Sequence, residues 1–341
     1  MKNGLKDAWG HSFYVGAAVN SSVLADKKCD ELIKQHFSSL TTENSMKFVC
    51  IHPEEKIWNW TETDNVINYA KKNNLAMRGH TMVWHNQVPQ WVFLDGNETV
   101  SKNLLFKRLE DHIATLTQRY GDYIYSWDVI NEAIDVDKGD ENNFRLSDWY
   151  KIGGKEVFEF AFKCMRQACP EAKLYYNDYN NETGKKMETT IKYISSLLDA
   201  GIPVDGIGIQ GHWYYNHPNE KILKNALDSY SALGINIELT EVDVSVYEWG
   251  TAKEKADFFT SKPQDRMLEQ AKRYHEIFNI ASEYSSVKNI TTWGLADNYT
   301  WLDDFPVKER KNWPLLFDEE LNEKSVVADL IDCGNKKKTG N

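Results

Sequence analysis

Short apolar runs alternate with longer amphipathic stretches along the whole chain. Each apolar run has the length of a β-strand and ends in a cluster of polar or aromatic side chains. Two of the intervening stretches, Leu104–Tyr120 and Thr189–Ala200, repeat apolar residues at helical spacing. The predicted strands are Phe13–Val19, Ser38–Asn44, Ala76–Trp84, Ile124–Glu132, Lys173–Asn180, Gly206–His212, Ile235–Asp243 and Ile290–Asp297.

Eight strands that alternate with helices predict a parallel sheet, and eight is the number that closes a (β/α)8 (TIM) barrel. Gly201 and Gly234 fit this fold, because each stands where a helix would end before the next strand. An open, doubly wound sheet is the competing architecture, but Gly16–Val19 is not the glycine-rich phosphate loop that normally follows its first strand. We expect one domain over residues 1–341, with a core at about 13–332 and a short, solvated basic C-terminal tail at Lys336–Lys338.

Two of the predicted strands run directly into carboxylates, one at Glu132 and one at Glu238–Asp243. A barrel gathers the C-terminal ends of its strands on one face, which is where barrel enzymes have their active sites. Cleavage of a bond between two sugars uses two carboxyl groups in different protonation states, one on each side of the bond. Either carboxylate alone could stand at a strand end by chance, but together they predict a glycoside hydrolase.

Strand alternation predicts which of these acids can meet. Glu241 and Asp243 share one side of their strand and should point into the barrel, whereas Glu238 should point outward as a structural acid facing a helix or loop. On the earlier strand Asp128 and Glu132 share a side. We interpret Asp128, which lies deeper, as a buried hydrogen-bonding acid and Glu132 as the reactive group.

The composition argues against several other classes of protein. The net charge is −11, and the 40 lysines and arginines are scattered without a basic stripe, so nucleic acid is not an expected partner. No stretch approaches the roughly 18 apolar residues of a membrane span. Five irregularly spaced cysteines and an N-terminus without a signal-peptide pattern predict reduced thiols in a cytoplasmic protein, or a secreted one if a signal has been trimmed. The oligomeric state is left open.

Cofactor and metal chemistry have little support in the sequence. There is no CxxC pair and no HExxH motif, and Asp303 and Asp304 are better read as loop acids than as calcium ligands, so we expect neither cofactor nor metal. The 12 tryptophans and 17 tyrosines exceed the needs of a core, and some should line a groove that binds sugar rings. The charged stretch Ala252–Pro263 is predicted to be an insertion, either a lid or, slightly favoured, a surface helix.

Seven segments in order resemble the endo-β-1,4-xylanases of glycoside hydrolase family 10, especially the members without a signal peptide. The similarity runs from about Val15 to Phe317, nearly the whole chain. The segments are Thr41–Phe48, Arg78–Gln87, Trp127–Ala133, Tyr176–Asn180, Ile209–Trp213, Thr240–Asp243 and Thr292–Asp297.

The resemblance implies catalytic roles for five residues. Glu132 would be the general acid/base and Glu241 the nucleophile, which must stay ionised while the acid holds its proton. His212, oriented by Asp243, would keep Glu241 charged, and Asn131 would hydrogen-bond the 2-hydroxyl of the sugar or the nucleophile. The reaction would retain the anomeric configuration through a covalent glycosyl-enzyme, with the carboxyl groups about 5–5.5 Å apart.

The resemblance also implies a set of sugar-binding residues and a preference for xylose chains. Bulky lining near the cleaved ring would disfavour a hexose, although one such group changes binding by only about 1–3 kcal/mol. The expected groups are Glu43, Asn44, Lys47, His80 and Gln87 with Trp84 toward the non-reducing end, Trp293 and Trp301 as floor and lid of the cleaved subsite, and Asn177, Tyr179 and Gln210 at or beyond the cleavage point.

Two rival functions stay open. A β-1,4- or β-1,3-glucanase on the same barrel is the rival enzyme, and a non-catalytic oligosaccharide-binding or glycosidase-inhibiting barrel is the rival of another class. Both carboxylates and all the segments above are intact, which favours an enzyme. Without an appended binding module, we expect xylo-oligosaccharides rather than insoluble xylan as substrates.

Overall fold

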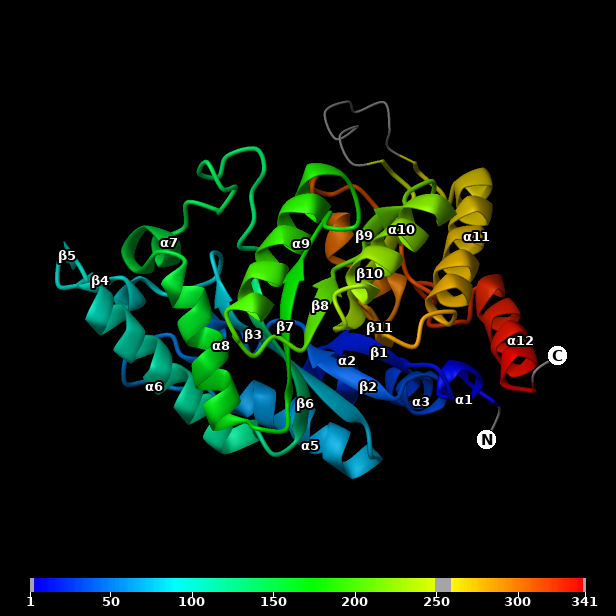
Figure 1. The fold of residues 1–341 in the computed structure, drawn as a ribbon. Coiled ribbons are helices and arrows are strands. Elements are labelled where there is room, and N and C mark those ends of the chain that lie inside the picture. The colour runs from blue at the N-terminus through cyan, green and yellow to red at the C-terminus, as the bar shows by residue number, and fades with distance from the viewer. Residues whose placement is uncertain (1–2, 249–258, 340–341) are drawn as a thin grey trace.

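A closed barrel of parallel strands stands at the centre of the molecule, with helices around it (Figure 1). The computed structural model describes residues 3–248 and 259–339. The main sheet has nine strands in the order β11-β1-β2-β3-β6-β7-β8-β10-β9, and pairing of β10 with β11 closes the ring. The eight barrel strands are β1 Tyr14–Val19, β2 Ser39–Thr42, β3 Ala76–Trp84, β6 Ile124–Asn131, β7 Lys173–Asp178, β8 Gly206–Ile209, β10 Asn236–Ser245 and β11 Val287–Thr292.

Three short strands lie outside this ring. β9 (His212–Tyr214) pairs with the end of β10, and β4 (Leu94–Asp95) and β5 (Glu98–Thr99) form a small hairpin. The helices are α1 Leu5–Trp9, α2 Ser21–Ala25, α3 Lys27–His36, α4 Phe48–Ile51, α5 Thr61–Asn73, α6 Lys102–Tyr120, α7 Asp148–Gly153, α8 Glu156–Ala168, α9 Gly184–Asp199, α10 Glu220–Ser231, α11 Gln264–Ala281 and α12 Ser325–Thr339, with 3-10 turns at Gln90–Val92, Asp297–Tyr299 and Trp301–Asp303.

The prediction of a single (β/α)8 barrel is confirmed. Both helices expected from apolar spacing are present as α6 and α9, each with a buried apolar face. Gly201 and Gly234 have φ angles of 69° and 73°, the left-handed conformation that a helix-ending glycine adopts at little cost. The open-sheet alternative is excluded, because β1 pairs with β11 on one side and β2 on the other.

The floor of the barrel holds a buried ion cluster that corrects one prediction. Glu238 does not point outward: with Arg78 and Asp128 it is fully buried, and the Arg78 guanidinium pairs with both carboxylates. Arg78 lies on β3 and Glu238 on β10, which are opposite each other in the ring, so their contact crosses the interior. The prediction failed because the register between β10 and β11 shifts between Leu239 and Val242, which interrupts simple alternation.

The prediction of a C-terminal tail at Lys336–Lys338 is also corrected, because these residues are helical. Lys336–Lys338 form the last part of α12, and the Lys337 ammonium donates to the Asn279 carbonyl at 3.0 Å and to the Ser282 hydroxyl at 2.7 Å. The Trp9 indole N–H donates to the Leu330 carbonyl at 3.0 Å, so the two ends of the described chain lie side by side (Figure 1). Basic residues at the end of a helix complement its negative pole, which favours an ordered terminus.

Three smaller points concern the described residues. Residues 252–258 of the predicted insertion lie outside them, and Gln264 begins α11 just after it. The five cysteines are unpaired. Among the described helices, none combines the length and the apolar character needed to cross a membrane.

Candidate active site

The predicted catalytic residues gather at the C-terminal ends of the barrel strands. Glu132 directly follows β6, Glu241 and Asp243 lie in β10, and His212 begins β9. Glu132 has a φ of 58°, a left-handed conformation that costs a non-glycine residue about 1–3 kcal/mol and often marks a functional site. Its backbone N–H donates to the Asn177 carbonyl at 2.9 Å, which ties the turn to β7.

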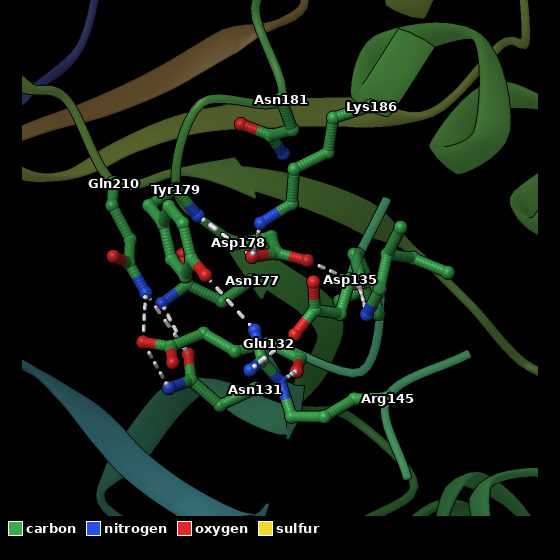
Figure 2. Close-up of polar contacts among 12 residues, drawn as sticks. Asn131, Glu132, Asp135, Arg145, Asn177, Asp178, Tyr179, Asn181, Lys186 and Gln210 are labelled. Atoms are coloured by element: carbon green, nitrogen blue, oxygen red, sulfur yellow. Dashed lines mark hydrogen bonds and ion pairs between the residues drawn. The ribbon is translucent and has the colours of Figure 1, made fainter. Parts of the chain in front are cut away.

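Neutral groups hydrogen-bond the Glu132 carboxylate, which is 9% exposed. Its Oε1 accepts from Gln210 Nε2 at 3.0 Å and from Asn131 Nδ2 at 3.3 Å (Figure 2). Its Oε2 lies 3.7 Å from His85 Nδ1. Burial, reinforced by the positive charge of Arg145, lowers the pKa of His85 to about 4, so this imidazole is uncharged near neutral pH.

A charged histidine, His212, hydrogen-bonds the carboxylate of Glu241. Oε2 of Glu241 lies 3.2 Å from His212 Nε2, and Asp243 Oδ2 lies 2.9 Å from His212 Nδ1. Burial would lower the pKa of His212, but Asp243 and Glu241 together raise it to about 10. Both ring nitrogens of His212 therefore donate, one to each carboxylate.

The pKa of Glu241 follows from the same contacts. Burial alone would raise it, but the hydrogen bond from His212 and the charges of His80 and His212 outweigh burial, so the pKa lies below its usual value. Glu241 is 5% exposed, and its Oε1 also accepts from Asn177 Nδ2 at 2.8 Å. Glu241 is thus held as a buried carboxylate anion.

Side-chain amides connect the two carboxylates. Asn177 Nδ2 donates both to Glu241 and to Asn131 Oδ1, each at 2.8 Å, and Gln210 Nε2 reaches Asn131 Oδ1 at 3.4 Å as well as Glu132. We call Asn131, Asn177 and Gln210 the amide ladder. The link from Asn131 to Glu241 therefore passes through Asn177 rather than directly. The ladder places Glu132 and Glu241 at one site although they are far apart in sequence.

Two tryptophans border the nucleophile. Trp301 Nε1 donates to Asp243 Oδ2 at 2.8 Å, and its ring lies edge-on to His212 at 4.9 Å between centroids. Trp293 lies edge-on to His80 at 5.2 Å and to His212 at 6.4 Å. Both rings therefore lie beside His212, and their roles as floor and lid of the cleaved subsite stay a prediction.

The residues expected toward the non-reducing end form a second group beside these tryptophans. The Lys47 ammonium lies 5.0 Å from the Trp84 ring, 5.8 Å from the Trp293 ring and 2.8 Å from Asn44 Oδ1. His80 Nδ1 lies 3.0 Å from Asp128 Oδ2. Lys47 is therefore a buried cation between two aromatic rings, and burial lowers its pKa.

Two further members of the predicted set lie nearer the surface. Glu43 Oε2 accepts from Asn20 Nδ2 at 3.3 Å. The Gln87 side chain is exposed, and its backbone carbonyl accepts from Val49 N–H at 2.8 Å. Their role in binding stays a prediction.

Tyr179 lies on the other side of Glu132, at a cavity of about 360 Å³. Its hydroxyl accepts from Arg145 Nη2 at 2.9 Å, and the Lys186 ammonium lies 3.3 Å from the centroid of its ring (Figure 2). Asp135, Tyr179 and Lys186 line this cavity together with Glu182 and others. A larger cavity of about 660 Å³ lies where strands begin, near Tyr125, and contains none of the predicted site residues.

Sequence reasoning missed three residues of the site: His85 and Arg145, which contact Glu132, and Lys186, which lies against the Tyr179 ring. His85 stands in the segment Arg78–Gln87, five residues after the predicted sugar-binding residue His80, and this proximity could have indicated a role at the site. Arg145 and Lys186 stand in stretches without any recognisable motif, and only the folded chain brings them to the site.

Metal-ligating side chains do not cluster in the described ranges, where no group of three or more His, Cys, Asp or Glu is arranged to hold an ion. Asp303, weighed above as a calcium ligand, instead accepts from Asn312 N–H at 2.9 Å and pairs with Lys311. Asp304 accepts from Glu309 N–H at 3.2 Å. Both acids therefore form contacts within the loop that follows Trp301.

Comparison with known proteins places the chain in a family. The sequence profile of glycosyl hydrolase family 10 matches residues 4–333. The chain belongs to glycosyl hydrolase family 10.

Individual relatives of this family 10 chain are similar along almost their whole length. Endo-1,4-beta-xylanase A of Caldicellulosiruptor saccharolyticus is 48% identical over 323 residues, covering 94% of this chain and 92% of that protein. The crystal structure of an endo-1,4-beta-xylanase from Caldicellulosiruptor owensensis matches with a TM-score of 0.92 at 41% identity, covering 97% of this chain and 99% of that one. A mutant protein solved in complex with xylotriose matches with a TM-score of 0.92 at 39% identity, covering 96% and 99%.

Proposed function

We propose that this family 10 chain is a retaining endo-β-1,4-xylanase, with Glu241 as nucleophile and Glu132 as general acid/base. The observation that carries the proposal is the asymmetry of two joined carboxylates. Glu241 is hydrogen-bonded by a charged imidazole, whereas neutral amides hydrogen-bond Glu132. A double displacement needs one permanently ionised carboxylate and one that can gain and lose a proton.

In the first step a Glu241 carboxylate oxygen attacks the anomeric carbon while Glu132 gives its proton to the departing glycosidic oxygen. The bond to the leaving sugar breaks as the bond to Glu241 forms, which leaves a covalent glycosyl-enzyme and an ionised Glu132. In the second step Glu132 takes a proton from water, whose oxygen attacks the same carbon and releases Glu241. Two inversions at one carbon give net retention.

The residues around Glu132 suggest where the two parts of the substrate would bind. Lys47, Trp84 and Trp293 would bind the sugars toward the non-reducing end, because the aromatic faces suit pyranose rings and the ammonium suits hydroxyl groups. The cavity at Tyr179 would take the leaving group. We propose xylan and xylo-oligosaccharides as substrates in view of the named relatives. Comparative rates on xylotriose and cellotriose test the preference over glucose chains.

Azide rescue on an activated aryl xylobioside tests the two roles. Glu132→Ala should still form the glycosyl-enzyme, and azide then attacks its β face, so the product is the β-glycosyl azide. Glu241→Ala lacks the nucleophile, and azide takes its place on the α face, so the product is the α-glycosyl azide. Reversed anomers would show that the roles are exchanged, and absence of hydrolysis by the wild type would refute the function.

A matched control separates these effects from general damage. Glu43→Ala changes a carboxylate in the binding region that has no proposed part in bond cleavage. It should alter KM, give no glycosyl azide and keep xylobiose as the product. Cytoplasmic location and the absence of a nucleic-acid partner stay predictions.

A further inference from the structure

We propose that Arg145 is the positioning residue of the acid/base: it fixes the backbone of Glu132 and couples that placement to Tyr179 in the leaving-group cavity. This inference rests on the proposed function. Arg145 would not touch the substrate bond itself. It would act through Glu132, and therefore only on the steps in which a proton is given or taken.

The first contact holds the turn that carries Glu132. Arg145 Nε donates to the Glu132 backbone carbonyl at 2.8 Å, and the Arg145 backbone N–H donates to the Ala133 carbonyl at 2.8 Å. Glu132 leaves its strand in a left-handed conformation, which persists only where the surroundings enforce it. Two hydrogen bonds from one residue to consecutive carbonyls supply that enforcement.

The other two arms of the guanidinium extend away from the turn. Nη1 donates to Asp135 Oδ2 at 2.9 Å, and Nη2 donates to the Tyr179 hydroxyl at 2.9 Å (Figure 2). A guanidinium is planar and presents its donors in a fixed fork, so three partners in three directions determine its orientation. A lysine ammonium offers no such fixed geometry. Arg145 therefore ties Glu132 and Tyr179 into one rigid unit.

Burial and a second cation, Lys186, restrict the movement of Arg145 and Tyr179. The side chains of Arg145 and Asp135 are only 17% and 16% exposed. Lys186, which lies against the Tyr179 ring, is itself fixed by an ion pair with Asp178 at 2.6 Å. Tyr179 is thus held at its hydroxyl by one cation and at its face by another. A sugar that packs in this cavity would meet a wall that is continuous with the acid/base.

Misplacement of the Glu132 carboxyl should affect some leaving groups more than others. Transfer of the Glu132 proton requires hydrogen-bond geometry with the departing oxygen, so misplacement of the carboxyl slows departure of poor leaving groups. A dinitrophenolate departs without protonation and is insensitive to this placement. The second step also needs Glu132, as a base, but azide can replace the water that Glu132 activates.

The experiment compares Arg145→Met and Arg145→Lys with the wild type on phenyl and dinitrophenyl β-xylobiosides. For Arg145→Met we expect kcat/KM on the phenyl substrate to fall roughly 10²-fold, the lower end of what a positioned acid contributes. On the dinitrophenyl substrate kcat/KM should stay within about threefold, while kcat falls and is restored by azide. Arg145→Lys should be intermediate.

The matched control is Arg166→Met. Arg166 donates to the Pro170 and Ala172 carbonyls and pairs with Asp205, so it is also a fork on backbone and carboxylate, but it lies beside the start of β7. Its substitution should leave both substrates and the azide response unchanged. Asp135→Asn is a milder variant that weakens one arm of Arg145 without removing the contact to Glu132, and it should show a smaller loss of the same selective kind.

The outcomes separate the inference from the function on which it rests. The positioning role would be overturned if Arg145→Met lost the same activity on both substrates and azide did not restore it. If Arg145→Met does not fold, the same result in Arg145→Lys and Asp135→Asn would overturn it. Hydrolysis by the wild type would still stand in that case. Failure of the wild type on both xylobiosides would instead refute the proposed function.

Discussion

The barrel interior contains two layers of carboxylates built from the same two strands, and they differ in what joins them. On the floor, Asp128 of β6 and Glu238 of β10 are bridged by the Arg78 guanidinium, and all three are fully buried. At the mouth, Glu132 after β6 and Glu241 of β10 are joined by the amide ladder instead. The floor pair shares a permanent cation, whereas the mouth pair shares neutral donors.

This difference separates a structural pair from a chemical one. A guanidinium between two carboxylates favours the anionic form of both and fills the space between them, and at Glu238 it opposes the burial that raises the pKa. Amide N–H donors favour the anionic form of a carboxylate less strongly than a cation does, so the only cation that hydrogen-bonds the mouth pair, among the described residues, stabilises the anion on one side. His212 does so at Glu241. The same strands thus support stability at one level and bond cleavage at the next.

The largest effect is expected from breaking the floor. Arg78→Met should lower the free energy of unfolding by about 3–5 kcal/mol, because it leaves Asp128 and Glu238 buried without their shared cation. Chemical denaturation measures this change. Arg119→Met is the control, because its ion pair with Asp64 is 43% and 30% exposed and should contribute no more than about 1 kcal/mol. Equal losses in the two variants would remove the distinction between the layers.

The next effect is expected from removing the cation at the mouth. His212→Gln keeps a donor but loses the charge, so we expect kcat/KM to fall about 10²–10³-fold. The sign of the pH effect follows from burial, which raises the pKa of Glu241 once the imidazolium no longer opposes it. A protonated nucleophile is inactive, so the acid limb of the pH profile should move to higher pH and the loss should be greatest in acid.

The wild type sets the reference for that profile. Because the pKa of Glu241 lies below its usual value and that of His212 is about 10, this pair should stay charged from mildly acidic to mildly alkaline pH. The measurement is kcat/KM on a dinitrophenyl xylobioside as a function of pH. An acid limb that does not move in His212→Gln would contradict the assignment of Glu241 as the group kept ionised.

The smallest effect is expected from the amide ladder on the Glu132 side. Gln210→Ala removes one neutral hydrogen bond to Glu132, which contributes about 1 kcal/mol, so kcat/KM should fall no more than about tenfold. The acid limb should not move, because the Gln210 side chain bonds Asn131 and Glu132 and not the Glu241 carboxylate, and the backbone bond from Glu241 N–H to the Gln210 carbonyl remains in this variant. A shifted acid limb in this variant would mean that the amides, and not His212 alone, set the charge of the nucleophile.

Local sequence patterns predicted the strands well but placed one acid on the wrong side. Strand runs and helical spacing recovered the barrel, and Glu132, Glu241, His212 and Asp243 were all assigned to one site. Unbroken alternation along the strand predicts that Glu238 points outward, and this prediction is wrong. A register shift in one strand pair cannot be read from the residues of that strand alone, since it depends on the neighbour with which the strand pairs.

By itself, the sequence determined the order of strands and helices, the acids that stand at strand ends and the family to which they belong. Those features depend on local periodicity and on motifs of a few residues. Only the tertiary structure decided that Arg78 joins opposite strands across the floor, that the amide ladder connects the two catalytic candidates, and that Arg145 holds the turn at Glu132. Such contacts join residues distant in the chain, and barrel closure and strand register fix their distances.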